Sequence, residues 1–584
     1  MSANRSAAYE LSPVIAVDGA HRAWAGAEAW REVLRVAEAR GGPAPLILVD
    51  VYPGADTAAI TLAIRAALPG CRVVDVEQAA KPIGEIDRMI APNLTDDRVL
   101  GVMSDHTLDE FYESAKLAHL ARGLAARTVP TVAVGWGAAL LNGADAVVIV
   151  DMARWELQLR QRAGAPNWRC ANGAEDPLRK AKRVYFVEWR VADRHKQAVW
   201  PQVDFVMDGN RAASEMTMVG VDTFWAGLDQ AVRRPFRVVP YFDPGVWGGQ
   251  WMKQRFGLDP APANYAWCFD CVPEENSIQF EVGSAVVELP AIDLVLARPR
   301  QLLGELTYAR FGAEFPIRFD LLDTMGGGNL SFQVHPLATY IRERFGMAYT
   351  QDESYYLLDA EDGARVYLGL KPGVDPAQMA DALRRADLGE ADFPAERYAA
   401  TFPARKHDHF SIPAGTVHCS GTGSMVLEIS ATPYIFTFKM WDWGRVGADG
   451  RPRPVHIEHA LNSIQWDRDA RWVASELVGR VREAGRGDGW REERTGLHHL
   501  EFIEVRRHWF TAPVAHNTAG TVNVLNLVQG DAALVTSPTG AFEPFEVHYA
   551  ETFIVPAAVG PYTIAPAAGA TGELATVKAW VRGT

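Results

Sequence analysis

The sequence predicts a multidomain chain in which an N-terminal α/β domain with a parallel sheet precedes an all-β region of two barrels. Three observations predict this fold class. The chain has 584 residues, more than a single core accommodates, so we expect three or four domains. The first 230 residues alternate short apolar runs with helix-like stretches. From about residue 495 onward, strand-like runs recur between turns rich in Pro and Gly.

Short apolar runs in the N-terminal region predict strands that are buried on both faces of a parallel sheet. These runs are 45–50, 72–76, 99–102, 131–134 and 146–150. The loop after the first run is Val51–Thr57, the place where a phosphate-binding loop would lie. The pattern GxxxxGK[ST] is absent, because this loop has one glycine and no lysine. The backbone cradle and the phosphate-binding lysine are therefore both missing.

Basic stretches later in the same region resemble the lid helices of nucleoside kinases in their arrangement. They are 151–160, 179–183 and 189–196. One interpretation is a sensor that binds a nucleotide or an anion. The alternative, which we favour, is a degenerate kinase-like domain kept for oligomerisation or stability.

The predicted domain boundaries rest on the positions of prolines and on the spacing of apolar residues. Pro235 and Pro240 mark the passage out of the α/β region, with the boundary at residues 210–235. Apolar residues recur at near-helical spacing between Pro376 and Arg405 and predict a helical insertion. We expect an α/β domain, a first barrel with this insertion, and a second barrel, at 1–230, 231–470 and 471–584.

The composition excludes several kinds of partner. A formal net charge of −14 argues against nucleic acid and anionic membranes. No stretch approaches the ~20 apolar residues of a membrane span, and Met1–Ala8 lacks the apolar stretch of a secretory signal. Five cysteines do not make a disulfide framework, and we interpret Cys268 and Cys271 as part of a strand. We expect a cytoplasmic protein.

Four residues near strand ends form a candidate metal site. Gln333 and His335 are two residues apart, so on a strand they project from the same face. Glu353 opens an apolar run of strand length, and His418 follows a Pro-Ala-Gly turn. Two imidazoles, a carboxylate and an amide oxygen suit a borderline ion such as zinc, with a coordination position left open.

The segments around these residues resemble the zinc-binding core of class I mannose-6-phosphate isomerases. They read Gln-Val-His-Pro, Asp-Glu-Ser-Tyr-Tyr and Ile-Pro-Ala-Gly-Thr-Val-His, in this order. The resemblance continues through Asp243–Gly249, Val366–Lys371 and Trp441–Arg445 and covers roughly residues 235–584. It implies a cupin fold, one Zn²⁺ per chain, and interconversion of mannose 6-phosphate with fructose 6-phosphate.

Further site residues follow from the chemistry and the resemblance. An enediol reaction needs a group that moves a proton, and we choose Glu428, whose alternative role is to orient a ligand. Lys439 stands where the family carries an Arg, and with Arg445 it would neutralise substrate charge. The family's lysines at two other positions are Asp320 and Gln351 here.

The loss of these two lysines leaves other donors for a phosphate. They are Arg318, Ser331 and Lys371. It also keeps two alternatives open: a non-catalytic zinc cupin that senses a sugar or nucleotide, and an isomerase of a different sugar. In the second barrel, the strand-turn Ala550–Ala557 carries no His, so we expect this barrel to be structural and metal-free.

Overall fold

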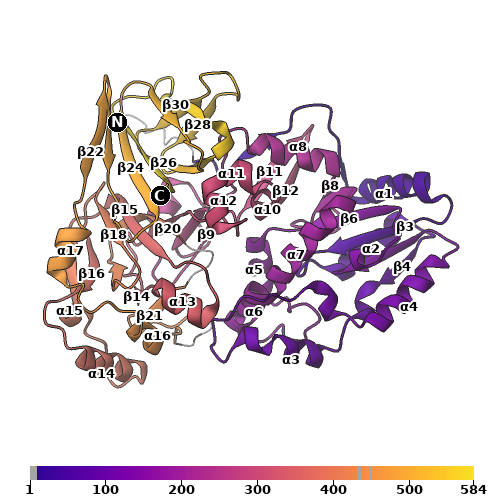
Figure 1. Cartoon of the computed structure of the whole chain (residues 1–584), viewed down its shortest axis with the longest axis horizontal. Coiled ribbons are helices and arrows are strands. Elements are labelled where there is room, and N and C mark those ends of the chain that lie inside the picture. Colours follow the sequence, from indigo (N-terminus) through magenta and orange to yellow (C-terminus); the bar gives the residue numbers. More distant parts are fainter. Residues whose placement is uncertain (1–8, 432–435, 448–449, 451, 497, 584) are drawn as a thin grey trace. The chain divides into compact units, whose positions relative to one another are not determined.

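A computed structural model describes residues 9–431, 436–447, 450, 452–496 and 498–583 (Figure 1). The segment Met1–Ala8, which we expected to lack a secretory signal, lies outside these residues. The chain divides into two compact units. The N-terminal unit comprises residues 14–230 and 274–297, and the C-terminal unit comprises the described parts of 1–13, 231–273 and 298–584.

The N-terminal unit contains a seven-stranded sheet. Its strands lie in the order β2 (Ala23–Ala25), β8 (Thr217–Gly220), β7 (Phe205–Asp208), β6 (Ala146–Asp151), β3 (Leu46–Val51), β5 (Thr131–Gly135) and β4 (Arg72–Asp75). The five strands from β7 to β4 pair in parallel, whereas β8 and β2 pair antiparallel at one end. Every residue of β3 is buried, as expected for a parallel sheet covered on both faces.

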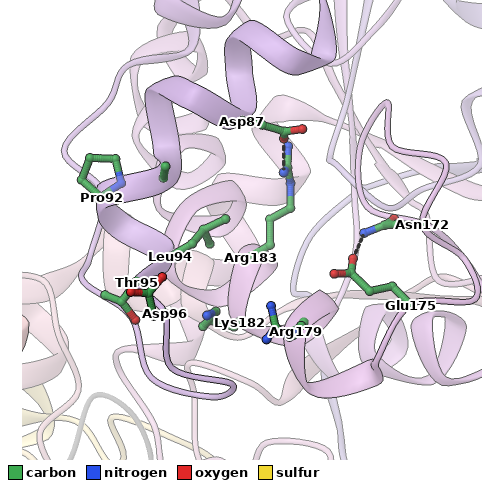
Figure 2. Close-up of a pocket in the computed structure, with 11 residues that line it drawn as sticks. Asp87, Pro92, Leu94, Thr95, Asp96, Asn172, Glu175, Arg179, Lys182 and Arg183 are labelled. Carbon is green, nitrogen blue, oxygen red and sulfur yellow. Dashed lines mark hydrogen bonds and ion pairs between the residues drawn. The ribbon is translucent and has the colours of Figure 1, made fainter.

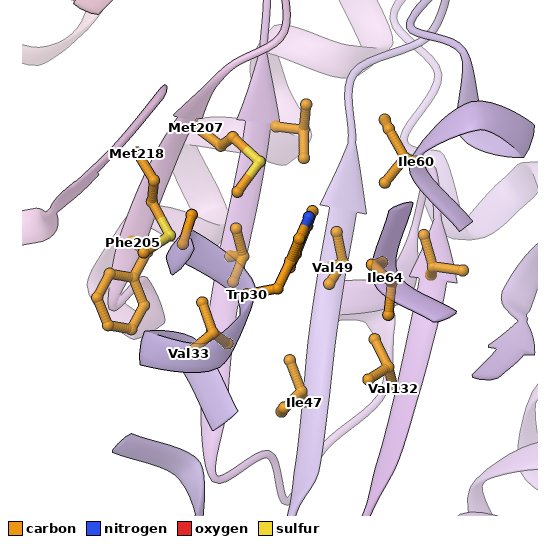
Figure 3. Packing of buried hydrophobic residues seen from close by; sticks show 14 of the residues in the cluster. Trp30, Val33, Ile47, Val49, Ile60, Ile64, Val132, Phe205, Met207 and Met218 are labelled. Carbon is orange, nitrogen blue, oxygen red and sulfur yellow. The ribbon is translucent and has the colours of Figure 1, made fainter. Parts of the chain in front are cut away.

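Helices alternate with the strands of this sheet. They are α1 (Gly26–Gly41), α2 (Thr57–Ala67), α3 (Ile83–Leu94), α4 (Ser114–Ala125), α5 (Arg154–Arg162), α6 (Pro177–Arg183), α7 (Trp189–Val199) and α8 (Val221–Ala231). On one face, Trp30 of α1 and Ile60 and Ile64 of α2 pack against Ile47 and Val49 of β3 (Figure 3). The apolar side chains of two helices thus form one core with the central strand.

The predicted strand at 99–102 is wrong. This segment lies in the loop after α3. Asp97 Oδ1 accepts hydrogen bonds from the backbone N–H groups of Val99 and Leu100, both at 2.6 Å. These donors are therefore not available to a β-ladder, and the apolar run only buries Leu100.

Residues 274–297 belong to the N-terminal unit. We had predicted one uninterrupted range for each domain, so this return of the chain was not anticipated. Strand β11 (Ser277–Val282) pairs in parallel with β1 (Val14–Ala16) and antiparallel with β12 (Ala285–Pro290). Helix α10 (Ile292–Ala297) follows. The chain therefore passes from one unit to the other at four places.

The C-terminal unit holds two pairs of sheets. The first pair consists of a six-stranded sheet and a five-stranded sheet. In order, their strands are β18 (His409–Ile412), β15 (Asp352–Ala360), β20 (Ser424–Ala431), β13 (Arg318–Asp323), β10 (Trp267–Cys271) and β9 (Tyr241–Asp243), and β17 (Ala399–Pro403), β16 (Arg365–Leu370), β19 (His418–Ser420), β14 (Phe332–Val334) and β21 (Phe438–Trp441). We call this pair the first barrel.

The second pair, here the second barrel, has a six-stranded and a four-stranded sheet. In order, the strands are β22 (Arg482–Gly487), β23 (Trp490–Arg494), β24 (Ile503–Phe510), β31 (Leu574–Val581), β26 (Asn523–Gln529) and β29 (Thr552–Val555), and β25 (Val514–Asn517), β30 (Pro561–Pro566), β27 (Ala532–Thr536) and β28 (Phe545–His548). The predicted region of two β-barrels is therefore present, and the Cys268–Cys271 segment is a buried strand, as predicted.

The two barrels share one strand order. The six-stranded sheet read from β29 to β22 corresponds strand for strand to the six-stranded sheet read from β18 to β9. The four-stranded sheet read from β28 to β25 corresponds in the same way to the strands from β17 to β14. In both comparisons the corresponding strands follow the same order along the chain. The register corresponds as well, since Val555 pairs with Asn523 as Ile412 pairs with Glu353. Only β21 has no counterpart among the described strands. The arrangement indicates an internal duplication.

Short helices complete the C-terminal unit. They are α9 (Trp251–Arg255), α11 (Pro299–Leu303), α12 (Glu305–Phe311), α13 (Ala338–Phe345), α14 (Pro376–Asp387), α15 (Ala395–Tyr398), α16 (Ile457–Leu461) and α17 (Ala470–Glu476). The predicted insertion 376–405 is helical only as far as Tyr398. Its last part is β17, which pairs with β16 and so belongs to the barrel.

Candidate metal centre

Three of the predicted metal ligands meet in the interior of the first barrel. His335 follows β14, Glu353 lies near the start of β15, and His418 begins β19. The Nε2 atoms of His335 and His418 lie 3.0 Å and 2.7 Å from the two carboxylate oxygens of Glu353. One ligand atom from each residue lies within 4.8 Å of the others, and all three residues are buried. Within the described ranges, no other His, Cys, Asp or Glu trio lies this close together.

Backbone carbonyl groups orient both imidazoles. His335 Nδ1 donates to the carbonyl oxygen of Phe436 at 3.1 Å, and His418 Nδ1 donates to that of Thr416 at 2.8 Å. Each Nδ1 is therefore engaged by a carbonyl group, and each Nε2 faces Glu353. A carbonyl partner on the far ring nitrogen is usual for a histidine that binds a metal.

The turn before β19 requires a glycine. Gly415 has a φ of +87°, which is strained for any residue with a Cβ, and an added Cβ would lie 2.8 Å from a side-chain carbon of Gln465. Its N–H donates to the carbonyl oxygen of His335 at 3.0 Å. The predicted Pro-Ala-Gly turn thus joins the two segments that supply the imidazoles.

The donor set fits a divalent cation. His335 Nε2 and Glu353 Oε1 are buried at ion-pair distance from their neighbours, yet neither makes a hydrogen bond of good geometry within the described structure. Gln333 extends the set, because its amide nitrogen lies 3.2 Å from His418 Nε2. A half-turn of this amide would place its oxygen there as a fourth ligand. Nitrogen and oxygen donors in this combination suit zinc.

Glu353 is held as a carboxylate. Burial alone would raise its pKa, but the two neighbouring imidazoles, His335 and His418, keep the pKa well below its usual value. The amide of Gln351 also donates to Glu353 Oε2 at 3.1 Å. The Glu353 carboxylate therefore supplies a negative charge that a cation can bind.

Glu428 lies beside this centre on β20. It pairs with Tyr355 of β15 on one side and with Asp320 of β13 on the other. Ser430 Oγ donates to its Oε1 at 2.9 Å, and Gln351 Nε2 does so at 3.4 Å. Burial, and then the charges of Glu353 and Asp320, raise the pKa of Glu428 well above its usual value. This environment favours the neutral carboxylic acid over the carboxylate.

Arg318 is not available as a free guanidinium. Its Nε donates to Asp320 Oδ2 at 2.5 Å, and its Cζ lies 5.2 Å from the ring centroid of Phe269. Both Arg318 and Asp320 are buried. Their positions two apart on β13 put both side chains on one face of the strand, which explains this pairing.

Lys439 lies next to the metal ligands. On β21 it pairs directly with Gln333 of β14, so the two side chains share a face. Burial, and then the charge of Arg453, lower the pKa of Lys439 to about 7. The amine is therefore poised between its two protonation states near neutral pH.

Ser331 and Arg445 meet at one carboxylate that the sequence analysis missed. Asp442 Oδ1 accepts from Ser331 Oγ at 2.9 Å and from Arg445 Nη2 at 2.5 Å. Its Oδ2 lies 3.0 Å from Nη1 of Arg453. Two guanidiniums and a hydroxyl thus converge on Asp442 as they would on an oxyanion. The Asp442-Trp443 sequence was read as a family motif, which gave no signal for this role.

Lys371 is the predicted residue with least connection to the centre. It follows β16, and its side chain is exposed. Its backbone N–H donates to the carbonyl oxygen of Tyr398 at 2.7 Å, and its carbonyl oxygen accepts from the N–H of Val374 at 3.4 Å. A role in substrate binding stays a prediction.

In the N-terminal unit, the position of the missing phosphate-binding loop carries its own carboxylate. Asp56 is the N-cap of α2, and its Oδ1 accepts from the backbone N–H of Ala59 at 2.9 Å. The helix end that would attract a phosphate therefore already has an acceptor. The resemblance to nucleoside kinases stays a prediction, as does oligomerisation.

The fold and the site together define a β-barrel protein with a buried His–Glu–His centre suited to a divalent metal ion. Comparisons agree with this class. The chain is 27% identical over 221 residues to mannose-6-phosphate isomerase of Streptococcus mutans serotype c, covering 38% of this chain and 64% of that protein. It is 25% identical over 238 residues to a probable mannose-6-phosphate isomerase of Bacillus subtilis, covering 39% and 68%. The C-terminal region therefore has homologues named mannose-6-phosphate isomerases, which confirms the resemblance.

A solved structure and a family model give two further similarities. The crystal structure of mannose 6-phosphate isomerase from Bacillus subtilis is similar at a TM-score of 0.48 and 18% identity, covering 59% of this chain and 99% of that chain. A family described as a domain of unknown function (DUF8485) matches residues 27–233. The chain spans 64% of the length of the Streptococcus relative. Among the helices that the structure describes, none has the length and apolar character needed to cross a membrane.

Proposed function

We propose that the C-terminal unit is a metal-dependent aldose–ketose isomerase that interconverts mannose 6-phosphate and fructose 6-phosphate, with Zn²⁺ as its metal. The meeting of His335, Glu353 and His418 beside Glu428 is the observation that carries this proposal. The names of the relatives support the sugar-phosphate class. Gln333 completes the proposed ligand set.

The residues of the site divide the work of the reaction. A bound divalent cation would polarise the oxygens on C1 and C2 of the sugar and add positive charge that favours the Glu428 carboxylate. Glu428 takes the proton from C2 of the aldose, and an enediolate with its charge on O2 forms as the proton of the C2 hydroxyl passes to O1. Glu428 then returns its proton to C1, and C2 is left as the ketone. Ser430 and Gln351 keep the carboxyl group in place through this exchange.

Cations near the centre suit a phosphate. Lys439 shares a face with Gln333, and Arg445 and Arg453 lie around Asp442. The proposal assigns the substrate phosphate to this side of the centre, because the other nearby cation, Arg318, is already paired with Asp320.

A coupled assay with full-length, zinc-loaded protein tests the proposal. Fructose 6-phosphate should form from mannose 6-phosphate, and His335→Ala should abolish both turnover and bound zinc. The matched control is His516→Ala, because His516 of the second barrel pairs with Tyr562 as Gln333 pairs with His418. This control should keep both properties. Full metal content in His335→Ala would contradict the ligand assignment.

A second candidate is an isomerase of a sugar without a phosphate. The pairing of Arg318 with Asp320 and the amide at Gln351 favour it, because neither position presents a free cation. Turnover of free mannose but not of mannose 6-phosphate would select it. Tight binding of sugar without any turnover would instead select a non-catalytic sensing cupin.

A further inference from the structure

The N-terminal unit contains a cavity of about 540 Å³ that the proposed isomerase activity does not use. Its walls come from the end of α3 and the residues after it, and from the segment that leads into α6 (Figure 2). Thr95 and Asp96 lie on one side, and Asn172 and Glu175 lie on the other. Its volume lies within the range of small-molecule sites.

Three cations enter this cavity from one face of a helix. Arg179, Lys182 and Arg183 are spaced i, i+3 and i+4, so α6 presents them together. Figure 2 shows the ends of Arg179 and Lys182 near each other, with Arg183 directed toward α3. This is the basic stretch that the sequence analysis compared with a kinase lid.

Two of these cations are buried and held in place. Arg183 is 8% exposed, and its guanidinium contacts Asp87 at 2.7 Å and Glu188 at 3.0 Å. Lys182 is 4% exposed, and its ammonium donates to the carbonyl oxygen of Asp97. Glu188 ends a π-helical turn, Val184–Glu188, that follows α6 directly. Such turns are frequent at functional sites because they redirect side chains.

Lys182 and Arg179 differ from Arg183, because neither of them makes an ion pair with a carboxylate among the described residues. Arg179 is exposed and makes no ion pair or side-chain hydrogen bond with the described residues. Burial lowers the pKa of Lys182, and the charge of Arg179 acts in the same direction, whereas the carboxylates of Asp97, Asp96 and Glu175 oppose this shift. An anion between the two cations would relieve this repulsion and would be bound by charge-assisted hydrogen bonds.

The remaining walls accept hydrogen bonds from hydroxyl groups. Asp96 and Glu175 contribute carboxylates, and Glu175 Oε2 accepts from Asn172 Nδ2 at 2.8 Å, which fixes its orientation. None of the residues that line the cavity is aromatic, so the site lacks a stacking platform for a nucleobase. The combination of two cations with hydroxyl acceptors fits a phosphorylated sugar better than a nucleotide.

We propose that this cavity is a second binding site for a sugar phosphate, with the phosphate between Arg179 and Lys182 and the sugar hydroxyls at Asp96 and Glu175. The ligand belongs to the same chemical class as the substrate under the proposed function. The site would let the chain bind its own substrate or product outside the metal centre.

Equilibrium titration of full-length His335→Ala protein with fructose 6-phosphate tests this site, because the background variant removes turnover. We expect Arg179→Glu to weaken one class of binding by at least about tenfold, and Lys182→Gln to weaken the same class. The matched control is Arg385→Glu, because Arg385 lines a cavity of about 540 Å³ in the C-terminal unit and is also exposed. The control should leave this binding unchanged.

Three results would overturn the proposal. They are unchanged binding in both Arg179→Glu and Lys182→Gln, equal binding of inorganic phosphate and fructose 6-phosphate, and tighter Arg179-dependent binding of AMP than of the sugar phosphate. Failure of the isomerase proposal is distinguishable from these, since Arg179→Glu in otherwise natural protein should retain full isomerase turnover. A protein without turnover that still shows Arg179-dependent binding would retain this site and lose only the enzyme.

Discussion

At the residue scale, two buried glutamates on neighbouring strands have pKa values displaced in opposite directions. Glu353 on β15 lies between two imidazoles, which hold its pKa low. Glu428 on β20 lies near two carboxylates, Glu353 and Asp320, which together with burial raise its pKa. Environments that separate the pKa values of two like groups give them different tasks, here charge storage and proton transfer.

Replacing Glu428 with Gln tests this division. The variant should lose turnover by about 10²- to 10⁴-fold, the range for a general acid–base group. It should keep its metal, because Glu428 is not a ligand. The measurement is kcat together with zinc content. Glu188→Gln is the matched control, since Glu188 is also fully buried with a raised pKa but lies in the N-terminal unit. Metal loss in Glu428→Gln would show that Glu428 acts through the ligand shell instead.

His409 makes the stability of the C-terminal unit sensitive to acid. This residue on β18 is 3% exposed, and burial, then Arg507, lower its pKa to about 3. The unfolded chain takes up a proton near pH 6.5, whereas the folded chain does so only near pH 3. Stability from this group is therefore complete above pH 6.5 and is lost as the pH falls toward 3, by about 1.4 kcal/mol per pH unit.

Urea unfolding at pH 7 and pH 4 measures this effect. The natural protein should lose more stability between these values than His409→Gln, whose side chain does not titrate. The difference between the two proteins isolates this residue from the other histidines. Parallel losses in both proteins would mean that His409 is already charged when folded.

The sequence could predict the ligands but not their neighbours. Spacing placed Gln333 and His335 on one face of a strand, and the resemblance of three local segments to a zinc-binding core brought His335, Glu353 and His418 together. Three side chains converge on Asp442, namely Arg445, Arg453 and Ser331. Of these, Ser331 lies more than 100 residues away from Asp442 in the sequence. No local pattern encodes which carboxylate a distant cation selects.

At the element scale, the corresponding registers explain why one barrel can hold a cation and the other is unsuited to it. Through the pairings of β26, β30 and β31, Asn523 stands in the place of Glu353, Tyr562 in that of His418, and Lys578 in that of Glu428. Arg506 pairs with Lys578 as Asp320 pairs with Glu428. At three positions where the first barrel has a carboxylate, the second barrel has a neutral or a cationic side chain. The expectation of a metal-free second barrel thus has a physical basis.

Helix α2 offers a test of the N-terminal core. Ile64 is fully buried against β3, whereas Leu62 on the same helix is 68% exposed. Ile64→Ala should destabilise the N-terminal unit by about 2–5 kcal/mol through lost burial and a cavity. Leu62→Ala should change the stability by less than about 0.5 kcal/mol. Hydrogen exchange of β3 amides measures both. Equal effects would mean that α2 does not pack as described.

Strand predictions succeeded where both faces are buried and failed where a side chain takes over the backbone donors. The runs at 46–51 and 146–151 are apolar apart from Asp50 and Asp151, are buried at every residue, and form β3 and β6. The run at 99–102 looks alike in sequence, but the preceding Asp97 bonds its N–H groups. Strands β2, β7 and β8 were not predicted, because they have only three or four residues each.

At the scale of the whole molecule, the N-terminal unit is discontinuous in sequence. Buried charges link its two segments, since Lys196 lies 2.5 Å from Asp293, and Glu274 lies 3.0 Å from Arg154 and 2.9 Å from Arg190. Lys196 and Arg154 are almost completely buried. A boundary at residue 230 is the natural reading of the sequence, because nothing in residues 274–297 marks them as partners of an earlier domain.

A fragment of residues 14–230 should therefore be unstable. It would lack β11, β12 and α10, and its buried Lys196 and Arg154 would lose carboxylate partners, a change that costs about 3–5 kcal/mol for one broken buried pair. Limited proteolysis and urea unfolding should show a fragment that is largely unfolded. Joining residues 274–297 to the fragment through a flexible Gly/Ser linker should restore cooperative unfolding. A 14–230 fragment as stable as the joined form would show that the returning segment only decorates the sheet, and that the charge pairs across it contribute little to the fold.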